Sequence, residues 1–170
     1  KKNNINYGIL RYFNVVGASP SGKIGLINKG DHLFKNFSIQ ILKKNPILKI
    51  YGKNYKTHDE TTIRDYIHVS DLAEIHIDLL NKISLTDKSV ILNCGYGKGI
   101  SVMEAAKEFK KLNKNKVKIL IKNRRAGDML RIVAQNSKLL KFLKWKPKYN
   151  KLTFIVKNCV MWEKKLQKKN

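Results

Sequence analysis

The sequence predicts an α/β fold, in which short apolar strands alternate with amphipathic helices. Runs rich in β-branched and aromatic residues, at 7–16 and 90–94, are typical of buried strands. Between such runs, apolar residues recur at the spacing of a helix, as they do over residues 33–42. Because 42% of the 170 residues are hydrophobic, the chain can bury a core and is not a disordered tail.

Local signals set the expected order of elements. The first helix must end before Pro46, since the residue preceding a proline disfavours helical geometry. Ser70 or Asp71 is expected to cap the second helix, and Ser101 with Glu104 forms a capping box that opens the third. We expect strands over residues 7–16, 48–51, 64–69, 90–94 and 117–121, a loop over 17–25, and helices that begin near 33, 70 and 101 or span 137–143 and 152–166.

The formal net charge of +24 has two interpretations. Lysine-rich surfaces attract polyanions such as nucleic acids. However, Lys, Asn and Ile all have codons rich in A and T and are all heavily used here, so genome composition explains the same charge. Nucleic-acid-binding proteins favour arginine for bidentate contacts, and arginine stands only at positions 11, 64, 124, 125 and 131. We therefore favour codon bias and do not expect a nucleic-acid partner.

Neither a metal site nor a membrane span is indicated. The two cysteines, Cys94 and Cys159, are far apart and form no CxxC pair, which argues against a zinc site or a disulfide framework and suits a reducing cytoplasm. No apolar run approaches the roughly 20 residues of a membrane span. Among the histidines, we expect His68 to be packed and hydrogen-bonded, and His76 to lie on an exposed helix face.

Two glycine-rich segments resemble phosphate-binding motifs without completing them. Residues 17–23 fit G-x-x-x-x-G-K, but Ile24 stands where a P-loop needs Ser or Thr, and Gly25 disfavours the helix that should follow. Residues 95–99 read G-x-G-x-G, and no acidic residue follows about 20 positions later, as a dinucleotide-binding turn requires. We expect both segments to be ordinary loops.

Arginine is scarce in this lysine-rich chain, so its positions are informative. A guanidinium grips a diphosphate with two parallel hydrogen bonds, which an ammonium cannot do. Arg64 opens a predicted strand, and Arg125 follows another strand end with Asp128 close behind. Ligands bind at strand ends in α/β folds. From the residues alone, a diphosphate clamp and surface salt bridging are equally supported.

An ordered set of motifs favours the clamp. RYFNVVGASPSGKIG, LKIYG, IRDYIHVSDLA, ILNCGYGKGISV, RRAGD and LKWKP follow one another between residues 11 and 147. Together they resemble the carboxy-terminal half of the UDP-glucose 4-epimerases, which are extended short-chain dehydrogenases/reductases of the NAD-dependent epimerase/dehydratase family. The resemblance implies the substrate-binding part of a Rossmann-type fold, with the last strands of its parallel sheet and a small mixed α/β substrate domain.

The resemblance also implies roles for individual residues. Phe13, with Tyr12, would contact the nicotinamide cofactor NAD. Arg64 and Arg125 would clamp the diphosphate of a UDP-sugar. The other implied substrate-binding residues are Asn14 at the nucleotide-sugar, His32 and Leu33 at a helix start near the diphosphate, Lys49 and Tyr51 on the strand that holds the uracil, Asp128 at the uridine ribose, and Ile132 near the sugar.

A missing pair limits the activity that the resemblance implies. In that family NAD oxidises the sugar C4 hydroxyl, the keto-sugar is reduced on its opposite face, and the tyrosine of a Y-x-x-x-K pair handles the proton. None of the seven tyrosines here has a lysine four positions later. We expect residues 1–170 to form one nucleotide-sugar-binding portion without a catalytic residue, inactive alone, with NAD bound mainly by an amino-terminal portion outside the chain. The expected partners are UDP-glucose or UDP-galactose, that amino-terminal half, and a second copy in a homodimer.

Departures from the family pattern leave the substrate open. Glu60 replaces a usual glycine, Ala126 replaces an acid, and Ile132 falls where the family decides whether N-acetylated sugars fit. Three alternatives therefore stand beside the 4-epimerase: another NAD-dependent UDP-sugar epimerase or dehydratase, a non-catalytic basic module for RNA or acidic surfaces, and a gene remnant that folds poorly.

Overall fold

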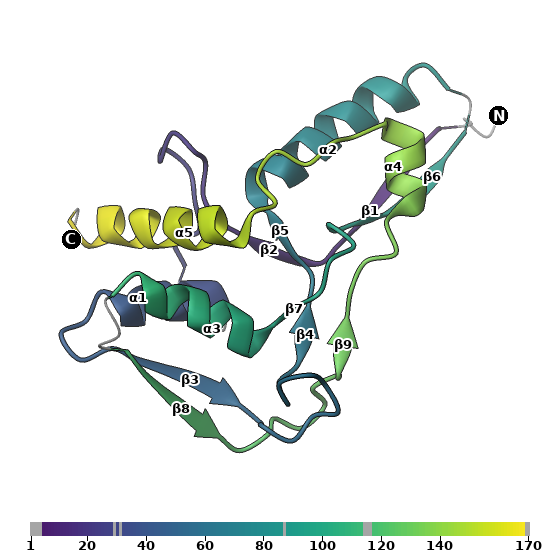
Figure 1. Ribbon diagram of the computed structural model, residues 1–170. Helices are drawn as coiled ribbons and strands as arrows, with labels where there is room; N and C mark the ends of the chain where they lie inside the picture. The colour runs from purple at the N-terminus through teal and green to yellow at the C-terminus, as the bar shows by residue number, and fades with distance from the viewer. Residues whose placement is uncertain (1–4, 29, 31, 87, 114–116, 169–170) are drawn as a thin grey trace.

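The computed structural model describes residues 5–28, 30, 32–86, 88–113 and 117–168 as an α/β structure (Figure 1). Its strands are β1 (Gly8–Tyr12), β2 (Asn14–Val16), β3 (Ile47–Tyr51), β4 (Ile63–Arg64), β5 (Tyr66–His68), β6 (Val90–Cys94), β7 (Ile100–Ser101), β8 (Lys118–Lys122) and β9 (Arg131–Ile132). Its helices are α1 (Leu33–Ile41), α2 (Val69–Ile83), α3 (Val102–Lys111), α4 (Ser137–Leu143) and α5 (Leu152–Gln167).

The described strands form four small sheets. Three are parallel pairs, β1 with β6, β2 with β5 and β3 with β8, and the fourth is a mixed sheet in the order β7-β4-β9. The expected arrangement, one set of last strands of a parallel sheet beside a small mixed domain, is therefore wrong in its sheet organisation. Parallel pairing itself follows from the long helical crossovers between partners.

Two apolar runs that each read as one strand are divided, because the chain changes partner within them. The amide of Phe13 donates to Cys94, whereas the next amide, of Asn14, donates to Asp65. The run 7–16 thus becomes β1, on β6, and β2, on β5. The run 64–69 is interrupted in the same way at Asp65, which separates β4 from β5.

Helices α1, α3 and α5 pack together, with α1 and α3 between α5 and β3 (Figure 1). Phe34, Phe109 and Ile155, one from each of these helices, lie in one buried apolar cluster. A second cluster forms where α2 and α4 cover the β1–β6 pair, around Ile75 and Leu92. β5 joins the two clusters, with Tyr66 in the first and Ile67 in the second, while β2 and α1 belong to the first. Residues of all three elements line the pocket described below.

Most helix starts agree with the local signals, with one correction. The capping box at Ser101 is confirmed, since its hydroxyl accepts from the Glu104 amide and the Glu104 carboxylate accepts from the Ser101 amide. The cap of α2 is neither Ser70 nor Asp71 but His68, whose Nδ1 accepts from the Ser70 amide. As expected, His68 is fully buried, and its Nε2 lies 3.1 Å from the Asn158 carbonyl oxygen.

Both glycine-rich segments are loops whose amides are already bonded within the chain. The Ser19 hydroxyl accepts from the amides of Lys23 and Ile24. The carboxylate of Asp65, which is fully buried, accepts from the amides of Tyr96 and Gly97 at 2.9 and 2.8 Å. These two amides of the 95–99 loop are therefore already bonded to an internal carboxylate.

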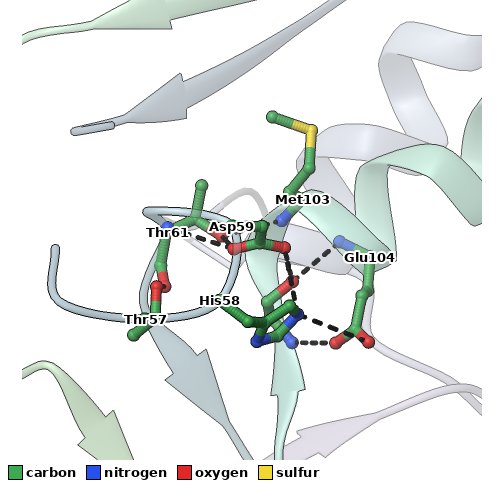
Figure 2. Close-up of polar contacts among 7 residues, drawn as sticks. Thr57, His58, Asp59, Thr61, Met103 and Glu104 are labelled. Atoms are coloured by element: carbon green, nitrogen blue, oxygen red, sulfur yellow. Dashed lines mark hydrogen bonds and ion pairs between the residues drawn. The ribbon is translucent and has the colours of Figure 1, made fainter. Parts of the chain in front are cut away.

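The loop between β3 and β4 is tied to the start of α3 (Figure 2). Asp59 accepts from the hydroxyl and amide of Thr61 on one oxygen and from the Ser101 hydroxyl on the other. The Thr61 hydroxyl in turn accepts from the Met103 amide. His58 lies 3.5 Å from Asp59 and 3.7 Å from Glu104. This network fixes the course of the chain immediately before Arg64.

None of the helices in the described part of the chain combines the length and apolar character that crossing a bilayer requires. Over the same residues, no group of three or more His, Cys, Asp or Glu side chains is arranged so that it could hold a metal ion.

Candidate functional site

A pocket of about 1070 Å³ opens between the β1–β2 junction, α1, β3, β4 and the segment 125–128. The residues expected at the substrate and cofactor come from all of these segments. Those that line the pocket are Tyr12, Phe13, Asn14, His32, Leu33, Lys49, Tyr51, Arg64, Arg125 and Asp128. Ile132 is the one expected site residue that is not among the described residues lining the pocket; it lies on β9, opposite Arg64 in the β4–β9 ladder.

Arg64 is held in place on two sides. Its side chain is 13% exposed, and one guanidinium nitrogen donates to the Ile63 carbonyl at 2.9 Å. Another guanidinium nitrogen lies 3.7 Å from a carboxylate oxygen of Asp128. A guanidinium that is oriented before a ligand arrives loses less conformational freedom on binding.

The neighbouring arginines of the 124–128 segment take different places. The guanidinium of Arg125 lies 3.9 Å from the centre of the Tyr51 ring and lines the pocket. The guanidinium of Arg124 lies 4.1 Å from the centre of the Tyr55 ring. Tyr55 is buried and is not among the described residues that line the pocket. Both contacts are cation–π pairs, but only the first brings a cation to the pocket.

The first turn of α1 adds a further electropositive feature. His32 is the N-cap residue and makes no side-chain cap hydrogen bond, and Leu33 begins the helix. Both residues line the pocket. The amides at a helix start carry partial positive charge and bind anions. Together with Arg64, Arg125 and Lys49, they make this region suited to a phosphate-bearing ligand.

The β1–β2 junction contributes neutral polar groups. The side-chain nitrogen of Asn14 donates to the Asp65 carbonyl at 3.2 Å. The hydroxyl of Tyr12 lies 2.6 Å from Nε2 of His76. Phe13, which lies between Tyr12 and Asn14 in the sequence, is half-buried.

Acid–base chemistry is not favoured at Tyr66, a buried phenol in the pocket wall. Burial raises the pKa of Tyr66, although the nearby charge of Arg64 acts in the opposite direction. Tyr66 therefore stays protonated at neutral pH. The arrangement can bind and orient an anionic ligand, whereas proton transfer requires a group with a pKa nearer to the working pH.

Sequence reasoning missed two features of this region. Lys35 and Glu163 form a buried ion pair that lines the pocket. A lysine between Phe34 and Phe37, on the apolar face of α1, is the signal from which a buried cation could have been predicted. His76 was expected on an exposed helix face, which is confirmed, but its contact with Tyr12 depends on how α2 packs beside β1.

A family model and individual sequences of known proteins are both similar to this chain. The NAD dependent epimerase/dehydratase family model matches residues 1–95, more than half of the chain. A UDP-glucose 4-epimerase of Azospirillum brasilense is 40% identical over 160 residues, which are 94% of this chain and 46% of that protein. UDP-glucose 4-epimerase 1 of Oryza sativa subsp. japonica is 42% identical over 146 residues, 83% of this chain and 41% of that protein.

Solved structures of UDP-glucose 4-epimerases are also similar to this chain. The UDP-glucose 4-epimerase of Stenotrophomonas maltophila, with bound NAD and formylated UDP-arabinopyranose, superposes with a TM-score of 0.89 at 32% identity, over 99% of this chain and 50% of that one. The enzyme of Bifidobacterium longum, in complex with NAD+ and UDP, gives 0.86 at 34% identity, over 96% and 49%. The chain thus spans about half the length of the relatives it matches.

These matches correct one expectation and establish another. The sequence analysis placed the chain in a carboxy-terminal, substrate-binding part of the fold and left the cofactor-binding part outside it. The family match at residues 1–95 contradicts that placement, because the segment characteristic of the NAD-dependent family lies within the chain. Family membership does not depend on that placement, and the chain belongs to the NAD-dependent epimerase/dehydratase family.

Proposed function

We propose that the pocket binds the UDP portion of a UDP-sugar and that the chain serves an NAD-dependent 4-epimerase that interconverts UDP-glucose and UDP-galactose. The observation that carries the proposal is that Arg64 and Arg125, which are far apart in the sequence, line one pocket together with Asp128. UDP or a UDP-sugar is bound by two of the relatives described above.

The diphosphate is the ligand group that best matches the cations. Each guanidinium presents paired N–H donors that fit two phosphate oxygens. Arg64 is oriented by Ile63 and Asp128, and Arg125 by the Tyr51 ring. The amides at the start of α1 supply further donors to the same anion.

The uridine is proposed to lie along β3 and the 125–128 segment. Lys49 and Tyr51 share the exposed side of β3, where their backbone groups and the tyrosine ring would meet a flat base. Asp128 offers a carboxylate to ribose hydroxyls while it remains 3.7 Å from Arg64. Ile132 is proposed to influence the sugar that fits indirectly, through its place beside Arg64 on the ladder.

The residues at the β1–β2 junction fit NAD. Tyr12 and Phe13 present two aromatic side chains at the pocket, and such rings suit the flat nicotinamide. When bound, NAD supplies the hydride chemistry that epimerisation needs. Because no tyrosine in the chain precedes a lysine by four positions, we assign no catalytic residue here and propose that the chain alone binds the nucleotide-sugar without turning it over.

Calorimetric titration with UDP tests the proposal. Arg64→Ala and Arg125→Ala are each expected to weaken UDP binding at least about tenfold, because each removes a charge-assisted contact. Arg124→Ala is the matched control: it deletes an adjacent arginine that also stacks on a tyrosine but lies outside the described pocket lining. UDP affinity that is equally sensitive at all three positions would contradict the clamp. Single-stranded RNA that displaces UDP stoichiometrically would favour the basic-module alternative instead.

A further inference from the structure

Tyr12, at the pocket, forms a polar pair with His76, and neither the proposed diphosphate clamp nor the proposed contact of the Tyr12 ring with nicotinamide uses its hydroxyl. Tyr12 ends β1 and lines the pocket, while His76 stands on α2. The phenol oxygen lies 2.6 Å from Nε2 of His76, and the two rings are tilted by 56°. The other ring nitrogen, Nδ1, lies 2.8 Å from the carbonyl oxygen of Leu72, one helical turn earlier.

The chemistry of these partners fixes every hydrogen. A carbonyl oxygen can only accept, so Nδ1 of a neutral His76 carries the proton and donates it to Leu72. The lone pair of Nε2 is then an acceptor, and the Tyr12 hydroxyl must donate to it. With its hydrogen committed to His76, the Tyr12 oxygen can offer a further partner only its lone pairs.

Asn14, two residues further along, has the same polarity. Its side-chain nitrogen is bonded to the Asp65 carbonyl, which can only accept, so the amide orientation is determined. The free end of the Asn14 amide is therefore its oxygen. The β1–β2 junction thus presents two hydrogen-bond acceptors, whereas Arg64 and Arg125 present donors and positive charge.

We propose that His76 is a positioning residue that holds the Tyr12 hydroxyl as a hydrogen-bond acceptor, so that this part of the pocket selects a ligand group that donates. Phosphates and ether oxygens cannot donate, but a hydroxyl or an amide N–H can. The inference rests on the proposed function for its ligands. Two sources have the required chemistry: a hydroxyl of the sugar in a UDP-sugar, and the carboxamide of a nicotinamide cofactor.

The first test needs no ligand. Nitrogen-15 NMR of labelled protein distinguishes the two neutral tautomers of each histidine, and loss of one set of signals in His76→Gln assigns His76 among the four histidines. The expected result is Nδ1 protonated and Nε2 unprotonated, with the Nε2 signal shifted in Tyr12→Phe. A proton on Nε2 of neutral His76 would overturn the proposal, whether or not UDP binds.

The second test identifies the donor by paired ligands. The ratio of affinities for UDP-glucose over UDP reports the sugar, and the ratio for NAD over ADP-ribose reports the nicotinamide. Tyr12→Phe is expected to lower one of these ratios about two- to tenfold, the effect of losing one neutral hydrogen bond. His76→Leu should lower the same ratio, and His76→Gln, which keeps an acceptor for the phenol, should restore part of it.

The outcomes separate the two proposals. Ratios that are both unchanged in Tyr12→Phe would overturn the acceptor role, even if UDP binds tightly. A wild-type chain that fails to bind UDP would refute the clamp, yet the tautomer measurement would still decide the role of His76. Because His76 is exposed on α2, circular dichroism of His76→Leu serves as the check that the helix is intact.

Discussion

The Asp59 carboxylate accepts a hydrogen bond from the Ser101 hydroxyl, which itself accepts from the first turn of α3. The capping box of α3 is thus extended by a residue 42 positions earlier. Burial raises the pKa of Asp59, but hydrogen bonds from Ser101 and Thr61 outweigh it and hold the pKa below its usual value of 3.8. This contact joins the helix to the loop that precedes Arg64.

Asp59→Asn is expected to destabilise the fold by about 1–2 kcal/mol, since it weakens charge-assisted bonds to two residues. A lowered carboxyl pKa contributes stability above pH 3.8, which is lost as the pH falls through the folded-state value. Chemical denaturation at a series of pH values from about 2 to 7 measures both the loss of stability in the variant and its dependence on pH. Asp78→Asn, at an exposed carboxylate on α2, is the control and should change stability little.

Glu60 has a positive φ of 64°, in the left-handed region. A non-glycine residue pays roughly 1–2 kcal/mol there, while glycine adds freedom to the unfolded chain. Glu60→Gly is therefore expected to raise the free energy of unfolding by about 0.5–1 kcal/mol. Thermal melts of the variant check this, with Glu60→Ala, which keeps the strain, as control. A lower melting temperature for the glycine variant would contradict it.

The buried Lys35–Glu163 pair offers a different test, because both side chains are less than a tenth exposed. Removing one partner leaves an uncompensated buried charge, so Lys35→Met should cost about 3–5 kcal/mol. Replacing both, as Lys35→Met with Glu163→Met, should recover most of that loss. The exposed pair Lys148–Glu74 provides the comparison, and Lys148→Met is expected to cost much less than Lys35→Met because water screens the exposed charges. Equal costs at the two pairs, measured by urea denaturation, would contradict the role of burial.

His68 makes stability depend on pH in the neutral range. Burial lowers its pKa below 6.5, although Asn158 and the charge of Asp71 act in the other direction. A depressed histidine pKa contributes stability above pH 6.5 that is lost as the pH falls through the folded-state value. The melting temperature should therefore drop between about pH 7 and 5. His68→Gln should flatten this dependence, whereas His58→Gln, at an exposed histidine, should leave it in place.

Local signals were sufficient where neighbouring residues decide the structure. Ser101 and Glu104 lie three positions apart, so their capping box was visible in the sequence. The boundaries of α4 and of β6 were likewise expected and observed. The motifs along the chain also predicted one site for Arg64, Arg125 and Asp128; all three line the pocket, and their roles stay a prediction.

Features set by distant partners could not be derived. The run 7–16 is continuous in the sequence, and only the positions of Cys94 and Asp65 divide it. His68 caps α2 because its ring is fixed by Asn158, 90 positions away, so the usual preference for Ser or Asp failed. Arg124 and Arg125 are adjacent, so the sequence alone does not show which of them reaches the pocket. In the structure Arg124 stacks on Tyr55 and Arg125 stacks on Tyr51.

The central claim is that two guanidinium groups bind a diphosphate. The most direct measurement compares the affinities for UDP and for uridine by calorimetry, in the wild-type chain and in the double variant Arg64→Ala with Arg125→Ala. The account predicts that UDP binds the wild type at least about tenfold more tightly than uridine, and that this preference is lost in the double variant. Equal affinities for UDP and uridine in the wild type would contradict it.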